Sequence, residues 1–126
     1  MFDGRLKAMF ENVSVKDTLK LVYEGKAYLY DIRDEEAYRR GHLPMAQSVR
    51  RDFLEEKITH EKHLQRNEKL AILYCDYGNQ SMHLAKELSD RGYGGIASMV
   101  GGYHAYEGYV EARKKDFWTM EWKERG

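Results

Sequence analysis

The sequence predicts an α/β fold of three layers, a mainly parallel sheet of about five strands with helices on both faces. Segments patterned as strands alternate with segments patterned as amphipathic helices, which is typical of βαβ units with right-handed crossovers. The run at residues 70–74 is short and continuously apolar, as expected for a central parallel strand covered on both faces. The length of 126 residues fits one compact domain with one core.

The first half of the chain is expected to form helix, strand, helix and a brief strand. Ser14 and Asp17 have the spacing of an N-cap and its N3 acid, and apolar residues recur at helical spacing until Gly25. A β-rich run follows, and its acidic end suits the start of a helix that stops at Gly41. The predicted elements are a helix at 15–24, a strand at 27–33, a helix at 35–40 and a strand near 46–49.

The second half repeats this alternation. Asp52 and Glu55 again have the spacing of a capping pair, and Ser81 is expected to cap a helix that ends near Gly92. The predicted elements are one broken helix or two short ones at 53–66, strands at 70–74 and 96–100 with the Ser81 helix between them, and a final helix from about Tyr103.

No internal repeat or low-complexity linker interrupts the chain, so we expect one domain over residues 1–126. Its core is expected at about 13–109. A charged helical extension at about 110–126 carries Trp118 and Trp122 at a spacing that shares one helical face.

Composition and charge exclude several classes of partner. Lys plus Arg number 21 and so do Asp plus Glu, so no net charge draws the chain toward nucleic acid or an anionic membrane. The single cysteine excludes an internal disulfide, and residues 1–10 lack the apolar core of a signal peptide. No apolar run approaches the roughly 18 residues that cross a bilayer. We expect a cytoplasmic protein whose partner is a small molecule or another protein.

Cys75 is the main candidate for chemistry. It ends the apolar strand directly before a glycine-containing turn and a helix start, and in open α/β sheets the functional crevice lies at the carboxyl ends of the strands. The turn amides and the helix N-terminus would stabilise a thiolate, and Gly78 and Asn79 tolerate the positive φ that such a turn needs. The alternative is a small buried hydrophobe, and the local pattern leaves both interpretations open.

Four segments carry a family resemblance. In order they are YDIRDEEAY at 30–38, GHLPMA at 41–46, YCDYGNQS at 74–81 and the pair at 101–102. With this order and spacing, the sequence from about Val13 to Tyr109 resembles a rhodanese-homology domain, and the resemblance favours the nucleophile over the buried cysteine.

The resemblance implies a sulfurtransferase that carries sulfane sulfur as a persulfide on Cys75. Its donor would be a small molecule or a protein persulfide, and its acceptor a thiol or a cyanide-type nucleophile. Thiolate attack on sulfane sulfur needs neither a cofactor nor a metal, and His60 and His63 lack a second pair of metal ligands. The loop that would wrap the persulfide with its amides, together with the residue that follows it, consists of Cys75, Asp76, Tyr77, Gly78, Asn79, Gln80 and Ser81.

Five further residues are candidates for pocket or structural support. Asp31 and Arg33 match the family's Asp-x-Arg and are interpreted as a structural pair that anchors the neighbouring loop. His42 is interpreted as a turn residue bonded to backbone rather than as a proton carrier. Arg50 and Arg51 follow a short strand, and either approach the pocket mouth or form a solvated basic face.

Three departures from the family pattern bear on the substrate and on rival functions. Gln80 stands where many active members have arginine, Asp76 adds a negative charge beside Cys75, and Met45 replaces a glycine. The first two count against thiosulfate, a dianion, as donor. A phosphatase would need a longer loop ending in a phosphate-binding arginine, and the sixth position after Cys75 is a serine. A non-catalytic interaction module is the second alternative.

Overall fold

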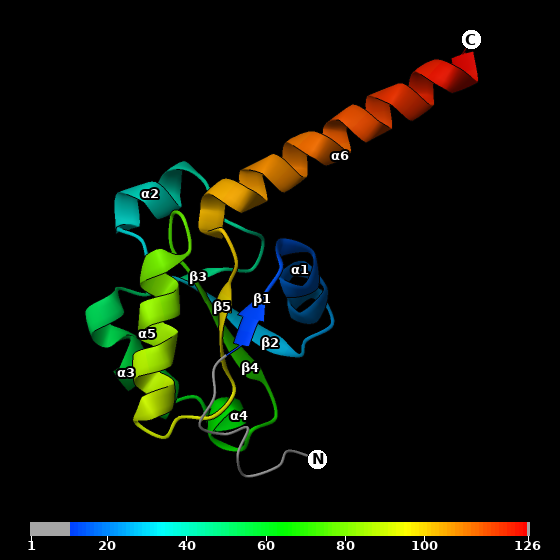
Figure 1. Ribbon diagram of the computed structural model, residues 1–126. Helices are drawn as coiled ribbons and strands as arrows, with labels where there is room; N and C mark the ends of the chain where they lie inside the picture. Colours follow the sequence, from blue (N-terminus) through cyan, green and yellow to red (C-terminus); the bar gives the residue numbers. More distant parts are fainter. Residues whose placement is uncertain (1–10, 126) are drawn as a thin grey trace.

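The computed structural model describes the backbone of residues 11–125 and the side chains of residues 11–115. Five strands form one sheet in the order β1-β5-β4-β2-β3, and every pair of neighbouring strands is parallel. The sheet is therefore entirely parallel, with β4 at its centre (Figure 1). The strands are β1 (Glu11–Val13), β2 (Ala27–Asp31), β3 (Gln47–Ser48), β4 (Leu70–Tyr74) and β5 (Ile96–Met99).

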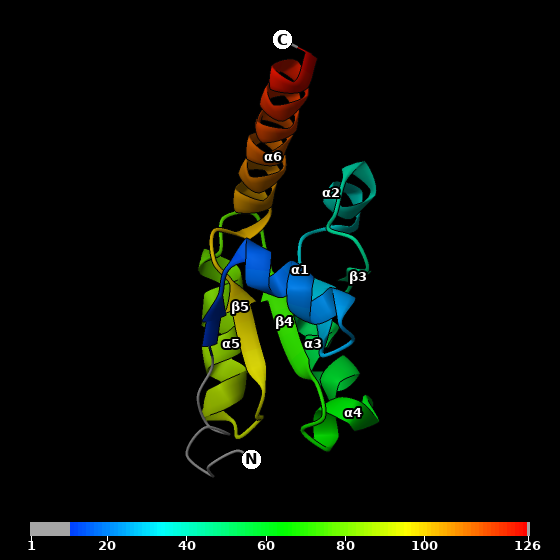
Figure 2. The ribbon, with the colours of Figure 1, turned by 90° about the vertical axis from the view of Figure 1, so that its right-hand side faces the viewer.

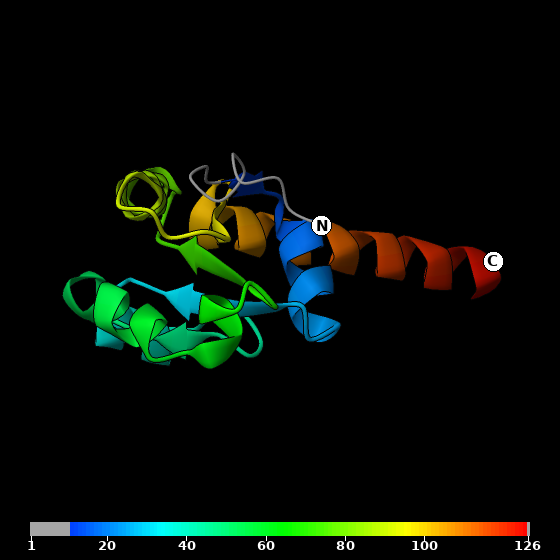
Figure 3. The same ribbon diagram turned by 90° about the horizontal axis from the view of Figure 1, so that it is seen from below.

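Helices cover both faces of this sheet, as Figures 2 and 3 show. One apolar cluster lies under α3 (Arg51–Thr59), α4 (Lys62–Gln65) and α5 (Asn79–Asp90). The other lies under α1 (Val15–Tyr23) and the first turns of α6 (Gly102–Arg125), whose remainder projects away from the sheet. The short helix α2 (Glu35–Arg40) lies beyond the carboxyl end of β2. The predicted α/β fold with three layers is confirmed.

The two-sided burial of β4 explains its continuous apolar sequence. Ala71 and Leu73 belong to the cluster under α5, whereas Ile72 and Tyr74 belong to the cluster under α1. All four side chains are fully buried, because successive strand residues point to opposite faces and both faces are covered. The strand that precedes Cys75 is thus held rigidly from both sides.

Helix starts were predicted with mixed success. Ser14 caps α1 as expected, since its side chain accepts a hydrogen bond from the Asp17 amide at 3.0 Å. The cap at Asp52 is wrong: α3 begins at Arg51, and its N-cap Arg50 makes no side-chain capping bond. The cap at Ser81 is also wrong, because the chain already turns into α5 at Asn79. Ser81 instead lies buried in the first turn of α5.

The edge strand β1 has no counterpart among the predicted elements. It pairs with β5 from Glu11↔Ala97 to Val13↔Met99, and only Val13 of its three residues is buried. Such a short strand with two exposed residues has no alternating pattern to detect. Residues 53–66 form two helices, which was one of the two open possibilities. Among the described residues, the helices contain no apolar segment of the length that a transmembrane helix needs.

Candidate active site around Cys75

Cys75 directly follows the central strand β4 and is buried, with 3% of its surface exposed. Its sulfur accepts hydrogen bonds from two backbone amides, Gly78 N at 3.1 Å and Ser81 N at 3.3 Å. Both donors lie at the start of α5, where backbone N–H groups have no partner within the helix. The chain therefore aims two N–H dipoles at one sulfur atom, an arrangement that stabilises negative charge on it.

Gly78 makes the inward turn possible. Its φ of 96° lies in the left-handed region, as expected from the sequence. A Cβ at this position would also lie 2.9 Å from the backbone nitrogen of Gly101, so the loop leaves no room for a side chain. Asn79, which was also expected to tolerate positive φ, instead begins α5 as an ordinary helical residue. One positive-φ residue is enough to curl the loop around the sulfur.

A pair of buried serines lies beneath the sulfur. Ser81 Oγ is 3.5 Å from Cys75 Sγ, donates to Gly78 O at 3.2 Å and lies 2.8 Å from Ser98 Oγ. Both serines are essentially inaccessible, at 0% and 1% exposure. The sequence reasoning missed Ser98, although a polar residue inside the apolar strand at 96–100 was a visible signal.

The turn between β5 and α6 holds the loop from the other side. The amide of Tyr103 donates to Cys75 O at 2.8 Å, and the amide of His104 donates to Asp76 O at 3.0 Å. A Cβ at Gly102 would lie 2.7 Å from the carbonyl carbon of Asp76, so only glycine allows this close approach. The Gly101-Gly102 pair noted in the sequence thus packs backbone against backbone at the site.

Asp31 and Arg33 form a buried ion pair at the end of β2. Arg33 Nη2 donates to Asp31 Oδ2 at 2.7 Å and to the carbonyl oxygen of Gly41 at 2.7 Å. Its guanidinium lies over the Tyr103 ring, 4.1 Å from the centroid. Burial by itself would lower the pKa of Arg33, but the hydrogen bonds and charge of Asp31 raise it. These contacts join β2, the loop after α2 and the start of α6.

Asp76 is the charged side chain of the loop, and it reaches back toward this ion pair. Its Oδ1 lies 3.8 Å from Arg33 Nη1, while 67% of its side chain remains exposed. The other outward-facing loop residues, Tyr77, Asn79 and Gln80, are exposed and uncharged. Because Arg33 is already bonded to Asp31, it offers little further positive charge to a ligand.

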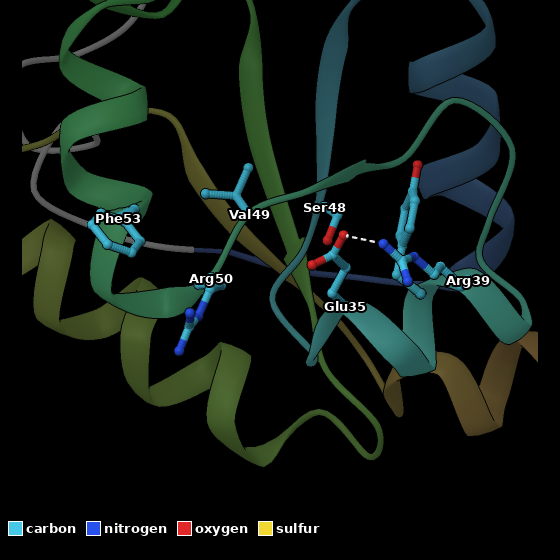
Figure 4. A pocket seen from close by; sticks show the side chains of 7 residues that line it. Glu35, Arg39, Ser48, Val49, Arg50 and Phe53 are labelled. Atoms are coloured by element: carbon cyan, nitrogen blue, oxygen red, sulfur yellow. Dashed lines mark hydrogen bonds and ion pairs between the residues drawn. The ribbon is translucent and has the colours of Figure 1, made fainter.

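The remaining predicted residues lie around other features. His42 Nδ1 donates a hydrogen bond to the carbonyl oxygen of Tyr38 at 2.9 Å, and its ring stacks on the Tyr38 ring, which fits a turn residue. Arg50 lines a hollow of about 440 Å³ formed with α2 and the start of α3 (Figure 4). Arg51 lines a separate hollow against α5. Neither arginine forms an ion pair with another described residue.

No three His, Cys, Asp or Glu side chains of the described residues gather as metal ligands. The predicted helical face of Trp118 and Trp122 lies outside the described side chains.

Comparison with known proteins identifies the family. The sequence of residues 14–109 matches the family model of the rhodanese-like domain. The chain belongs to the rhodanese-like domain family. The match extends from the N-cap of α1 into the first turns of α6, so it includes every described element of the candidate site.

Solved structures share this rhodanese-like fold. A protein of unknown function from Rhodopseudomonas palustris, named as a possible tyrosine phosphatase, is 28% identical, with a TM-score of 0.68 over 80% of this chain and 82% of its own. A human single-domain sulfurtransferase is 23% identical, with a TM-score of 0.62 over 78% and 96%. A rhodanese-related protein from Thermoplasma volcanium is 18% identical, with a TM-score of 0.65 over 79% and 93%. At 23% and 18% identity, the similarity to these last two proteins shows a shared fold and nothing more.

Proposed function

We propose that this rhodanese-like domain is a sulfurtransferase that carries sulfane sulfur as a persulfide on Cys75. The observation that supports it most is the pair of amides, from Gly78 and Ser81, that donate to the cysteine sulfur. A buried structural cysteine needs no such donors, since a thiol is satisfied as a small hydrophobe. A sulfur atom that becomes an anion during each cycle does need them.

The reaction needs only sulfur chemistry. The Cys75 thiolate attacks the sulfane sulfur of the donor, a new S–S bond forms, and the donor's own S–S bond breaks with its electron pair leaving on the donor remnant. An acceptor thiolate or cyanide then attacks the outer sulfur, and Cys75 departs as a thiolate. Atoms and electrons balance without an external acid, base or oxidant. The first-turn amides of α5 are suited to hold the outer sulfur of the persulfide.

The proposal is tested by sulfur loading. The purified protein is mixed with thiosulfate and, separately, with an uncharged sulfane-sulfur donor, and its intact mass is measured. We expect a gain of one sulfur atom, its removal by cyanide as thiocyanate, and neither event in Cys75→Ser. A folded protein that takes sulfur from neither donor would contradict the proposal and would favour a non-catalytic interaction module.

A phosphatase is the rival function, since the similar Rhodopseudomonas palustris protein is named as a possible tyrosine phosphatase. Phosphoryl transfer from a cysteine loop depends on a bidentate arginine clamp. In this chain residues 76–81 contain no arginine, and nearby Arg33 is committed to Asp31 and Gly41 O. We therefore expect no hydrolysis of an aryl phosphate ester. Hydrolysis that Cys75→Ser abolished would reverse this choice.

A further inference from the structure

The hydroxyl of Ser98 has one described neighbour to which it can donate. Ser98 lies on β5, which pairs with the strand that precedes Cys75, and its Oγ is 2.8 Å from Ser81 Oγ. Among the residues that the structure describes, Ser81 is its one hydrogen-bond partner. A buried hydroxyl proton without an acceptor costs free energy, and Ser81 Oγ is the one described acceptor for the Ser98 proton. We therefore expect the Ser98 proton to point to Ser81 Oγ.

This direction decides where the Ser81 proton goes. Ser81 Oγ has a single proton and three neighbours: Ser98 Oγ, Gly78 O and Cys75 Sγ. If Ser98 donates, the Ser81 proton is free to point to Gly78 O or to the sulfur. If Ser98 accepted instead, it would take this proton, and the Ser81 hydroxyl would have nothing to donate to a sulfur anion.

The two states of the sulfur use this freedom differently. With a neutral thiol, the S–H donates to Ser81 Oγ, and the Ser81 proton points to Gly78 O. When the sulfur is a thiolate, its proton has gone to solvent, and a rotation about the Ser81 Cβ–Oγ bond turns the hydroxyl proton to the sulfur. Gly78 O keeps a partner after this rotation, because the amide of Met82 also donates to it at 3.1 Å.

We propose that Ser98 is a positioning residue that acts through Ser81 to stabilise the sulfur anion at Cys75. Its donated hydrogen bond keeps the Ser81 proton from pointing to Ser98, so that this proton is available to the sulfur, and it also polarises the Ser81 hydroxyl. For the persulfide anion this role rests on the proposed sulfurtransferase function. For the thiolate it does not, since the thiolate exists whether or not sulfur is transferred.

The test compares three serine variants by the rate at which iodoacetamide alkylates Cys75, measured from mildly acidic to mildly alkaline pH. Ser98→Ala removes the donor, and Ser98→Thr keeps a hydroxyl. Ser89→Ala is the matched control, because Ser89 is equally buried on α5 and its hydroxyl has no described partner. Near-ultraviolet and far-ultraviolet circular dichroism establish that each variant is folded.

We expect Ser98→Ala to react about threefold more slowly than the parent at neutral pH. This change is smaller than the loss of a direct hydrogen bond to a charged group would cause, because Ser98 acts on the sulfur through Ser81. The difference should vanish at alkaline pH, where the thiolate is fully formed. Ser98→Thr should recover the parent rate, and Ser89→Ala should match the parent throughout.

Equal rates for Ser98→Ala and the parent at every pH would overturn the proposal. A slowing by the same factor at every pH would also overturn it, because that result indicates changed access rather than changed stability of the anion. Sulfur loading of the parent protein is scored separately. If the parent shows the expected alkylation pattern but takes up no sulfur, the sulfurtransferase proposal fails while the role of Ser98 stands.

Discussion

Asp76→Asn is expected to increase the use of thiosulfate, because Asp76 adds a negative charge next to Cys75 that Arg33 offsets only in part. Asp31 and Arg33 form a tight pair, and Asp76 lies 3.8 Å from the same guanidinium. These three side chains together carry one net negative charge. Replacing Asp76 with asparagine makes the group neutral at nearly constant shape.

The magnitude follows from Coulomb's law and the exposure of Asp76. Two unit charges about 5 Å apart at an effective dielectric constant near 20 interact by roughly 3 kcal/mol. The carboxylate is largely exposed and partly offset by Arg33, which reduces the repulsion to about a third, about 1 kcal/mol. This energy corresponds to about a fivefold gain in kcat/KM. The gain should appear mainly in KM, because repulsion opposes the approach of the donor.

The assay measures kcat/KM for thiosulfate and for an uncharged sulfane-sulfur donor at low and high salt. Asp90→Asn is the matched control, because Asp90 also lies in an ion pair, 3.2 Å from Lys86 Nζ, but at the opposite end of α5. A helix of this length separates the two ends by about 17 Å, which exceeds the Debye length of roughly 10 Å at 0.1 M salt.

Only Asp76→Asn with thiosulfate should show the gain, and the gain should shrink as salt is added. Unchanged kinetics of Asp76→Asn with thiosulfate at low salt would refute the reasoning. The arginine missing at Gln80 would then be the one remaining ground for doubting a dianionic donor.

Two further predictions concern the loop and the core. Gly78→Ala should reduce sulfur loading at least tenfold, since its Cβ would lie 2.9 Å from Gly101 N. Gly92→Ala is the control, because Gly92 also has a positive φ but has open space around a Cβ. This control should lose only about 1–2 kcal/mol of stability and should load sulfur normally. Equal loading by both variants would contradict a tightly packed loop. Tyr30→Phe should leave stability at neutral pH unchanged or raise it by up to about 1 kcal/mol, because the buried Tyr30 hydroxyl has no partner among the described residues. Burial raises the pKa of Tyr30 above its ordinary value of about 10, because the folded protein disfavours the ionised side chain. The free energy of unfolding is therefore unaffected by this group below about pH 10, and it falls as pH rises further and the unfolded chain ionises. Urea unfolding should therefore show that Tyr30→Phe loses less stability at alkaline pH than the parent does. Tyr74→Phe should instead be destabilised at neutral pH, because it removes the acceptor of the Leu43 backbone N–H. A Tyr30→Phe variant less stable than the parent at neutral pH would count against this account.

Much of the fold was predictable because its signals are local. The strand at 70–74 was recognisable from its continuous apolar run, and the cap at Ser14 from the spacing to Asp17. The caps expected at Asp52 and Ser81 show where such reasoning fails. A capping pattern indicates only that a side chain is able to bond to a free amide at a helix start. In this chain α5 begins at Asn79, two residues before Ser81, and Ser81 is buried in the core.

Apart from the edge strand β1, the sequence by itself determined the order of strands and helices, the position of Cys75 after the central strand and the need for glycine at position 78. These features follow from hydrophobic periodicity and from backbone conformations that few residues adopt. Only the tertiary structure decided that β1 pairs with β5, that Asp76 faces Arg33 and that Ser98 lies beneath Ser81. Parallel strands are joined by long crossovers, so residues that meet at one sheet edge lie far apart in the chain, and no local pattern encodes which of them touch.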